Sequence, residues 1–131
     1  MHSIVRRLGE RISNTEEELD SLEILRKMVA VLDDRLAKNI QVIDIRGLSI
    51  MADYFVVASA NNINHIHALA DYLEEEMRKN NIHFTHMEGF KSGNWILMDY
   101  GDIVVHIFDE PSREFYDLER IWRDGKIMDI G

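Results

Sequence analysis

Apolar positions recur at steps of three and four from residue 15 onward, which predicts an amphipathic helix over residues 15–39. Thr15 and Glu18 have the spacing of a capping box, so we expect the helix to begin there. Its apolar face consists of Leu19, Leu22, Leu25, Val29, Leu32 and Leu36. Such a face is expected to pack against a sheet or a second helix.

The same spacing predicts two further helices. Residues 61–81 form one of them, with Asn61 or Asn62 as the cap. Its apolar face consists of Ile66, Leu69, Ala70, Leu73 and Met77. A last helix is predicted over residues 109–122, because Pro111 is favoured in a first helical turn. The residues expected on its buried face are Phe115, Leu118 and Trp122.

Runs of β-branched and aromatic residues predict five strands between and after the first two helices. The first two runs are NIQVIDIRG and DYFVVASAN, which end at residues 47 and 61. The segment LSIMA between them is too short for a parallel crossover, so these strands are antiparallel or joined by an irregular loop. The other three strands are predicted over residues 82–89, 95–100 and 103–108.

The order of these elements predicts the fold class. One helix, two strands, a second helix, three strands and a last helix follow one another with short connections. We therefore expect an α/β (α+β) sandwich, in which helices flank a mixed β-sheet. Residues 123–131 (RDGKIMDIG) are expected to form a polar tail.

The length of 131 residues is typical of one domain, which we expect over residues 15–131. Residues 1–14 are expected to form a frayed N-terminal arm. The arm has no apolar core long enough for a secretory signal, and no apolar run approaches the roughly 18 residues of a membrane span. The expected location is the cytoplasm, without a membrane partner.

Charge and cysteine content narrow the classes of function. The net charge of −9 opposes non-specific binding to nucleic acid and favours a basic partner. There is no cysteine, which excludes disulfides, thiolate chemistry and zinc sites that depend on cysteine. His65 and His67 are two residues apart and point away from each other on a helix, so we expect solvated histidines rather than a metal site.

The segment NWILMDYGDIVVHIF, residues 94–108, concentrates the candidate chemistry in one predicted hairpin. Its loop is either Tyr100–Gly101 or Gly101–Asp102, and both registers place Trp95, Asp99 and His106 on one side of the sheet. The other side carries only apolar residues and is expected in the core: Ile96, Met98, Ile103, Val105 and Ile107.

A face that mixes Trp, Asp and His is either covered by a helix or open to a binding partner. Both alternatives stay open for Trp95, and we favour a functional role for Asp99. Catalysis is the rival interpretation: Asp99 and His106 could form an acid/base pair, and Asp99 with Asp102 could hold a divalent metal. However, the chain has no phosphate-binding glycine pattern, and spacing places no third carboxylate near this pair.

Four segments together resemble the ribosomal silencing factor family, also called RsfS or Iojap-like proteins. They are VIDIRGLSIMADYFVVAS, INHIHALADYLEEEM, EGFKSGNWILMDYGDIVVHIF and SREFYDLERIW. The resemblance covers about residues 20–123, in the same order as in the family. It is specific, because W-x-L-x-D-x-G-D-x-V-V-H-x-F followed by R-x-F-Y-D-L-E-x-x-W is a long signature.

The resemblance implies a mixed-sheet fold of nucleotidyltransferase-like topology, without known catalysis and without a cofactor or metal. It implies binding to large-subunit ribosomal protein L-fourteen, at the face of the large ribosomal subunit that meets the small one. Occupying that face blocks joining of the subunits and lowers translation when nutrients are short. Trp95, Met98 and Asp99 stand where the family motif has partner-contact residues, and His106 is added as a partner-binding candidate from the hairpin.

Three hypotheses follow. The first is a ribosome-binding translational repressor, whose expected docking aromatic is Trp95. The second is a metal-dependent nucleotidyl- or phosphoryl-transfer enzyme that uses Asp99 and Asp102. The third is a scaffold protein that forms homodimers through its first helix or its N-terminal arm. The weak catalytic signals and the acidic charge favour the first.

Overall fold

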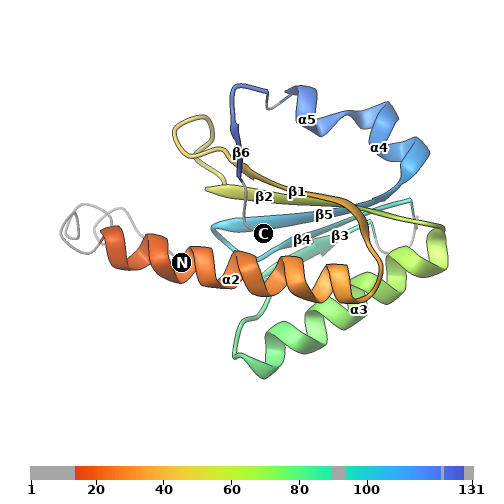
Figure 1. Cartoon of the computed structure of the whole chain (residues 1–131), viewed down its shortest axis with the longest axis horizontal. Helices are drawn as coiled ribbons and strands as arrows, with labels where there is room; N and C mark the ends of the chain where they lie inside the picture. The colour runs from red at the N-terminus through yellow and green to blue at the C-terminus, as the bar shows by residue number, and fades with distance from the viewer. Residues whose placement is uncertain (1–13, 90–93, 122, 129–131) are drawn as a thin grey trace.

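The structure, a computed structural model, describes residues 14–89, 94–121 and 123–128 (Figure 1). The expected arm over residues 1–14 lies almost wholly outside this part, as does Trp122. The elements, in chain order, are α2 (Asn14–Asp34), β1 (Lys38–Asp44), β2 (Tyr54–Ala60), α3 (Ile63–Lys79), β3 (His86–Glu88), β4 (Trp95–Asp99), β5 (Ile103–Asp109), α4 (Glu110–Tyr116), α5 (Leu118–Ile121) and β6 (Lys126–Met128).

The strands form one mixed sheet in the order β3-β4-β5-β2-β1-β6. β2 and β5 pair in parallel at its centre, and the other neighbouring strands pair antiparallel. The parallel pair requires a crossover, which α3 provides together with the excursion through β3 and β4. The predicted mixed sheet flanked by helices is therefore confirmed, and so is the antiparallel pairing of β1 with β2.

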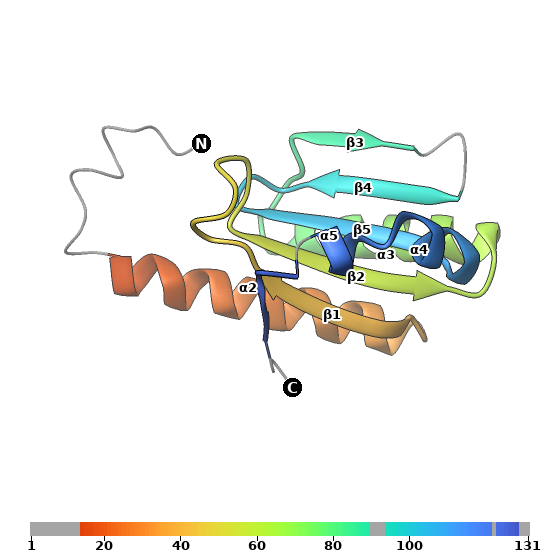
Figure 2. The same cartoon turned by 90° about the horizontal axis from the view of Figure 1, so that it is seen from above.

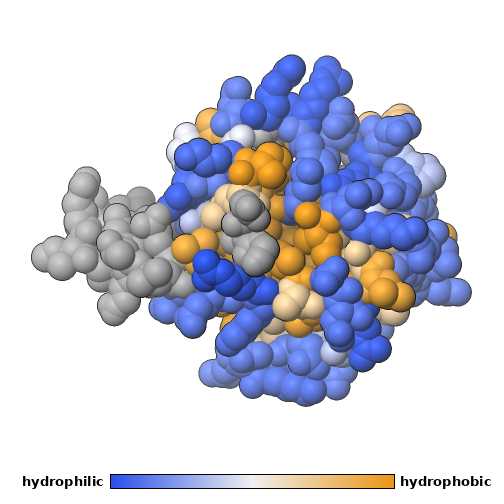
Figure 3. Space-filling view, in the orientation of Figure 1, coloured by the Kyte–Doolittle hydropathy of each residue, from blue (hydrophilic) through white to orange (hydrophobic). Residues whose placement is uncertain are grey.

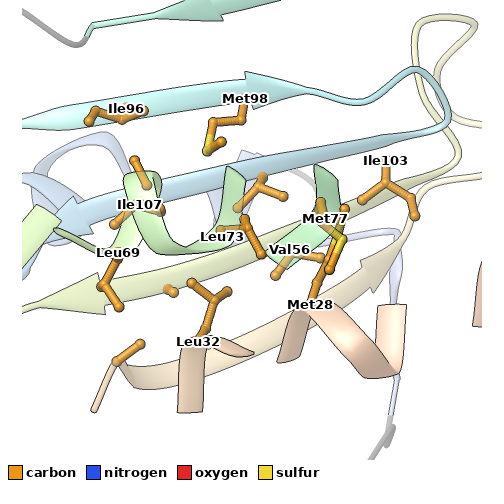
Figure 4. Packing of buried hydrophobic residues seen from close by; sticks show 14 of the residues in the cluster. Met28, Leu32, Val56, Leu69, Leu73, Met77, Ile96, Met98, Ile103 and Ile107 are labelled. Carbon is orange, nitrogen blue, oxygen red and sulfur yellow. The ribbon is translucent and has the colours of Figure 1, made fainter. Parts of the chain in front are cut away.

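α2 and α3 cover one face of the sheet, whereas α4 and α5 lie over the other (Figures 1 and 2). The face covered by α2 and α3 carries the larger core, which includes Leu32, Leu73, Met98 and Ile107 (Figure 4). The five residues predicted for the core side of the hairpin, Ile96, Met98, Ile103, Val105 and Ile107, are each at most 3% exposed. Strict alternation in β4 and β5 explains this success.

The observed ends of α2 and α3 differ in part from those predicted by the periodicity of apolar residues. α2 begins at Asn14, and the side chains of the expected capping box lie outside the described part. Leu36 was expected on the apolar face, but the helix ends at Asp34 and Leu36 is 73% exposed with a φ of 67°. That expectation was wrong, because helical spacing no longer applies after the helix ends. For α3, the cap is Asn62, whose side chain accepts a bond from the backbone N–H of His65.

The C-terminal region departs most from the prediction. The single helix expected over residues 109–122 is broken into α4 and α5 at Asp117, which has a φ of 48°. Phe115 was expected to be buried, but it is 81% exposed. After the break, Leu118 is buried against the sheet.

The expected polar tail contains a strand, since β6 pairs with β1 and forms an edge of the sheet. Figure 3 shows this side of the molecule, with hydrophobic side chains in the middle and hydrophilic ones around them. Ile127 of β6 is an exposed apolar residue. Within the described ranges, no helix is long and apolar enough to cross a membrane.

Candidate functional site

The face of the sheet opposite α2 and α3 is only partly covered. Seen from above, α4 and α5 lie over β2 and β5, whereas β4 is left uncovered (Figure 2). The apolar residues of this face include Val57, Val104 and Phe108, which are buried, but Phe55, Trp95 and Leu97 are only half-buried. We call the group formed by Phe55, Trp95, Leu97, His106, Phe108 and Tyr116 the aromatic face.

The hairpin register brings the predicted residues to this face. Asp99 pairs with Val104, Leu97 with His106, and Trp95 with Phe108. This register corresponds to the Gly101–Asp102 loop, the second of the two predicted. Trp95, Asp99 and His106 therefore lie on one side of the sheet, as both registers required.

Trp95 is held between the sheet and α4. Its indole ring stacks on Phe108 with ring centroids 4.9 Å apart, and it contacts Tyr116 at 4.6 Å. The indole Nε1–H donates a hydrogen bond of 3.2 Å to Nδ1 of His106. Because Trp95 remains partly exposed, it combines a fixed orientation with surface that a partner could still cover.

His106 lies below this surface and is only 4% exposed. Tryptophan N–H can only donate, so Nδ1 accepts and the proton of the neutral imidazole is on Nε2. Among the described residues, Nε2 is buried without a hydrogen-bond partner. Burial lowers the pKa of His106 from 6.5 to about 4, so the ring is neutral at pH 7. Direct contact with a partner is not available to His106 in this structure.

Asp99 has a structural task in the hairpin. Its Oδ1 accepts a hydrogen bond of 2.8 Å from the backbone N–H of Gly101, which has a φ of 93°. An aspartate that bonds the backbone two residues on is a common way to close a turn. The half-buried carboxylate also lies beside the aromatic face, where its charge can serve a basic partner.

Met98 requires a correction. The family resemblance implied that it contacts a partner, but its side chain is 0% exposed and packs in the core below the sheet. It neighbours Leu97 in sequence and points to the opposite face. Met98 can therefore act on a binding surface only through the packing of β4.

The described part of the chain gives little support to a catalytic or metal site. His106 accepts from Trp95, and Asp99 accepts from the turn, so the two do not form the acid/base pair considered above. No group of three or more His, Asp or Glu residues suited to a metal ion occurs in the described ranges. Among the described residues, Asp99 and Asp102 therefore belong to no such group.

His65 was expected to be a solvated helix residue, but both of its ring nitrogens have hydrogen-bond partners within the protein. Its Nδ1 accepts from the backbone N–H of Asn61, and its Nε2 is 2.9 Å from the carbonyl oxygen of Arg35. The ring therefore ties the start of α3 to the end of α2. The only sequence signal for this linking role was the position of His65 in the first turn of a helix, directly after a loop.

Sequence reasoning missed two members of the aromatic face, Phe55 and Tyr116. Phe55 comes from β2, and its ring centroid lies 4.7 Å from that of His106. Tyr116 is the last residue of α4 and is 43% exposed. Both reach the hairpin only through long-range packing, which local patterns do not report.

A polar cleft of about 590 Å³ lies beside α4. The buried Arg113 at this cleft donates to Glu119 and, over 2.7 Å, to Oγ of Ser59. These bonds join α4 and the segment after it to β2. We interpret the network as the anchor that holds α4, and with it Tyr116, over the sheet.

The fold is a mixed-sheet α+β domain, and its aromatic face presents partly exposed aromatic residues. The sequence profile of the family described as "Ribosomal silencing factor during starvation" matches residues 18–131. The chain belongs to the ribosomal silencing factor family.

Individual relatives agree with this membership. The chain is 35% identical over 112 residues to the ribosomal silencing factor RsfS of Bacillus subtilis strain 168, covering 86% of this chain and 95% of that one. It is 37% identical over 108 residues to the RsfS of Zymomonas mobilis, covering 82% and 81%. A crystal structure of a Chromobacterium violaceum protein is similar with a TM-score of 0.75 at 29% identity, covering 82% of this chain and 88% of that one.

Proposed function

We propose that this protein represses translation by binding the large ribosomal subunit and blocking its association with the small subunit. The proposal takes the class of partner from the family, whose name refers to ribosomal silencing during starvation. The observation that supports it is the partly exposed Trp95, which stacks on Phe108 and contacts Tyr116 on a sheet face that α4 and α5 cover only in part. Preordered aromatic residues of this kind often supply most of the affinity at a protein interface.

Charge supports the choice of partner. The chain carries a net charge of −9, and complementary charge speeds encounter with a basic ribosomal protein. We infer that large-subunit ribosomal protein L-fourteen is the partner and that it covers Trp95, Leu97 and Asp99. Tyr116 and the exposed Phe115 extend this surface along α4. Met98 and His106 support the surface from below.

Silencing by steric exclusion requires no chemical step. A bound domain that occupies the joining face excludes the small subunit for as long as it stays bound. The affinity of the docked protein and its residence time therefore determine how strongly translation is lowered.

The test is co-sedimentation with isolated large subunits, followed by a subunit-joining assay. Wild-type protein should pellet with large subunits and reduce joining, and Trp95→Ala should bind at least about tenfold more weakly. Ile63→Ala is a matched control, because Ile63 is an exposed apolar residue of α3, on the opposite face of the sheet. Unchanged joining at saturating wild-type protein would rule out the proposed function.

We also infer a homodimer as an alternative use of exposed apolar surface. Light scattering across concentration decides this point. A mass that rises with concentration in the wild type but not in Trp95→Ala would indicate that dimerisation and docking use the same surface. A constant monomer mass would remove the homodimer.

A further inference from the structure

His106 is the one polar side chain buried in the middle of the aromatic face. Its ring lies 5.8 Å from the ring of Trp95 and 6.3 Å from that of Phe108. With Phe55 on its other side, the imidazole is enclosed by aromatic rings. Fully buried histidines normally satisfy both nitrogens, so the single hydrogen bond made by this ring calls for an explanation.

The one side-chain hydrogen bond of His106 goes to Trp95, a partly exposed member of the aromatic face. The indole of Trp95 stacks on Phe108 and contacts Tyr116 at a tilt, and these ring contacts alone do not determine which edge of the indole points into the sheet. The bond from Nε1–H to Nδ1 of His106 determines this edge. The other edge is then the one presented to the surface.

We propose that His106 is a positioning residue, which holds the indole of Trp95 in its docking orientation by keeping the lone pair of Nδ1 available. The arrangement requires the neutral ring with its proton on Nε2. The loss of hydrogen bonding at Nε2 is then the cost of placing an acceptor beneath Trp95. Pre-ordering the indole lowers the entropy lost on docking.

The surroundings keep His106 in this form. Phe55 from β2, Trp95 and Leu97 from β4, and Phe108 from β5 face the ring, and none of them carries a charge. Asp99 lies on the same side of β4, but its Oδ1 is bonded to the hairpin turn. Burial lowers the pKa of His106 to about 4, so Nδ1 stays unprotonated throughout the neutral range.

A double-mutant cycle on the full chain tests the inference through affinity for large subunits, and this arm rests on the proposed function. His106→Leu keeps an apolar side chain but loses the acceptor, and should weaken binding about three- to tenfold, as expected for one hydrogen bond. In the Trp95→Phe background, which has no indole N–H to position, His106→Leu should change affinity by less than about twofold. An equal loss in both backgrounds, or no loss in the wild type, overturns the proposal.

Nuclear magnetic resonance of the free protein provides an arm that does not depend on the ribosome. The indole N–H signal of Trp95, assigned by its absence in Trp95→Phe, should shift and exchange faster with water in His106→Leu. In the wild type at pH 7, the ring nitrogens of His106 should show an unprotonated Nδ1 and a protonated Nε2. The opposite tautomer overturns the proposal even if His106→Leu fails to fold.

The conservative variant His106→Asn distinguishes two roles of His106: accepting the hydrogen bond that positions Trp95, and filling space beneath the aromatic face. The amide oxygen of asparagine stands near the place of Nδ1 and can accept the indole N–H, so the Trp95 signal should stay slow to exchange. A Trp95 signal as fast as that of His106→Leu would oppose the inference. Wild-type protein that fails to bind large subunits would instead refute the proposed function, and the resonance arm would still decide the role of His106.

Discussion

The two faces of the sheet are built from alternating residues of the same strands, yet they differ in what covers them. In β4, Met98 points toward α2 and α3 and is fully buried, whereas its neighbour Leu97 points to the aromatic face and stays half-buried. The long helices seal one face with aliphatic side chains, but the short α4 and α5 cover only part of the other. One face therefore stabilises the domain, and the other has surface left for a partner.

The largest expected effect is a difference in stability between variants of Met98 and Leu97, which are neighbours in β4 but point to opposite faces of the sheet. Met98→Ala should lower the free energy of unfolding by about 2–5 kcal/mol, because it opens a cavity in a sealed core. Leu97→Ala should cost only about 1 kcal/mol, since its side chain is already partly in water, but should weaken docking. Urea denaturation of both variants measures the difference. Equal losses would show that the two faces contribute alike to stability.

A second prediction concerns the only buried histidine of the aromatic face and uses pH. The pKa of His106 is about 4 in the folded chain and near 6.5 when unfolded, so between these values the unfolded state binds more protons. Stability from this group is fully present above pH 6.5 and falls as the pH drops toward 4, by up to about 3 kcal/mol.

The measurement is the difference in unfolding free energy between wild type and His106→Asn, followed from pH 7 to pH 4. Groups common to both proteins cancel in this difference. The unfolding free energy of the wild type should fall relative to that of the variant as the pH drops. A difference that stays constant with pH would show that His106 does not remain neutral in the fold.

The smallest expected effect lies at the edge of the aromatic face. Asp99→Ala removes the acceptor that closes the hairpin turn and should lower stability by about 0.5–1.5 kcal/mol. Asp99→Asn keeps an oxygen acceptor and removes the charge, so it should retain stability and weaken only the charge-dependent part of docking. Thermal unfolding and large-subunit binding at two salt concentrations distinguish these contributions. If both variants unfold alike, the turn bond has no measurable role.

The sequence predicted the side to which each hairpin residue points, because strand alternation is a local property. Alternation along the strands predicts Trp95, Asp99 and His106 on one face and Met98 on the other, and the observed register agrees. The reading of Met98 as a contact came from family resemblance, and the alternation argument against it was the better guide.

Features that depend on distant parts of the chain were not predictable in this way. β6 is only three residues long and is formed by pairing with β1, so no local sequence pattern predicts it. The break at Asp117 depends on a left-handed residue whose type permits but does not require that conformation. Phe55 and Tyr116 join Trp95 only because β2 lies beside β5 and α4 returns over them.

The central parallel pair also sets the order in which the domain can form during synthesis. β2 ends at Ala60, but its partner β5 begins at Ile103, and the aromatic face is complete only when Tyr116 has been added. Because chains emerge from the amino end, most of this protein leaves the exit tunnel before its proposed docking face exists. A growing chain therefore lacks the complete aromatic face until residue 116 has been synthesised.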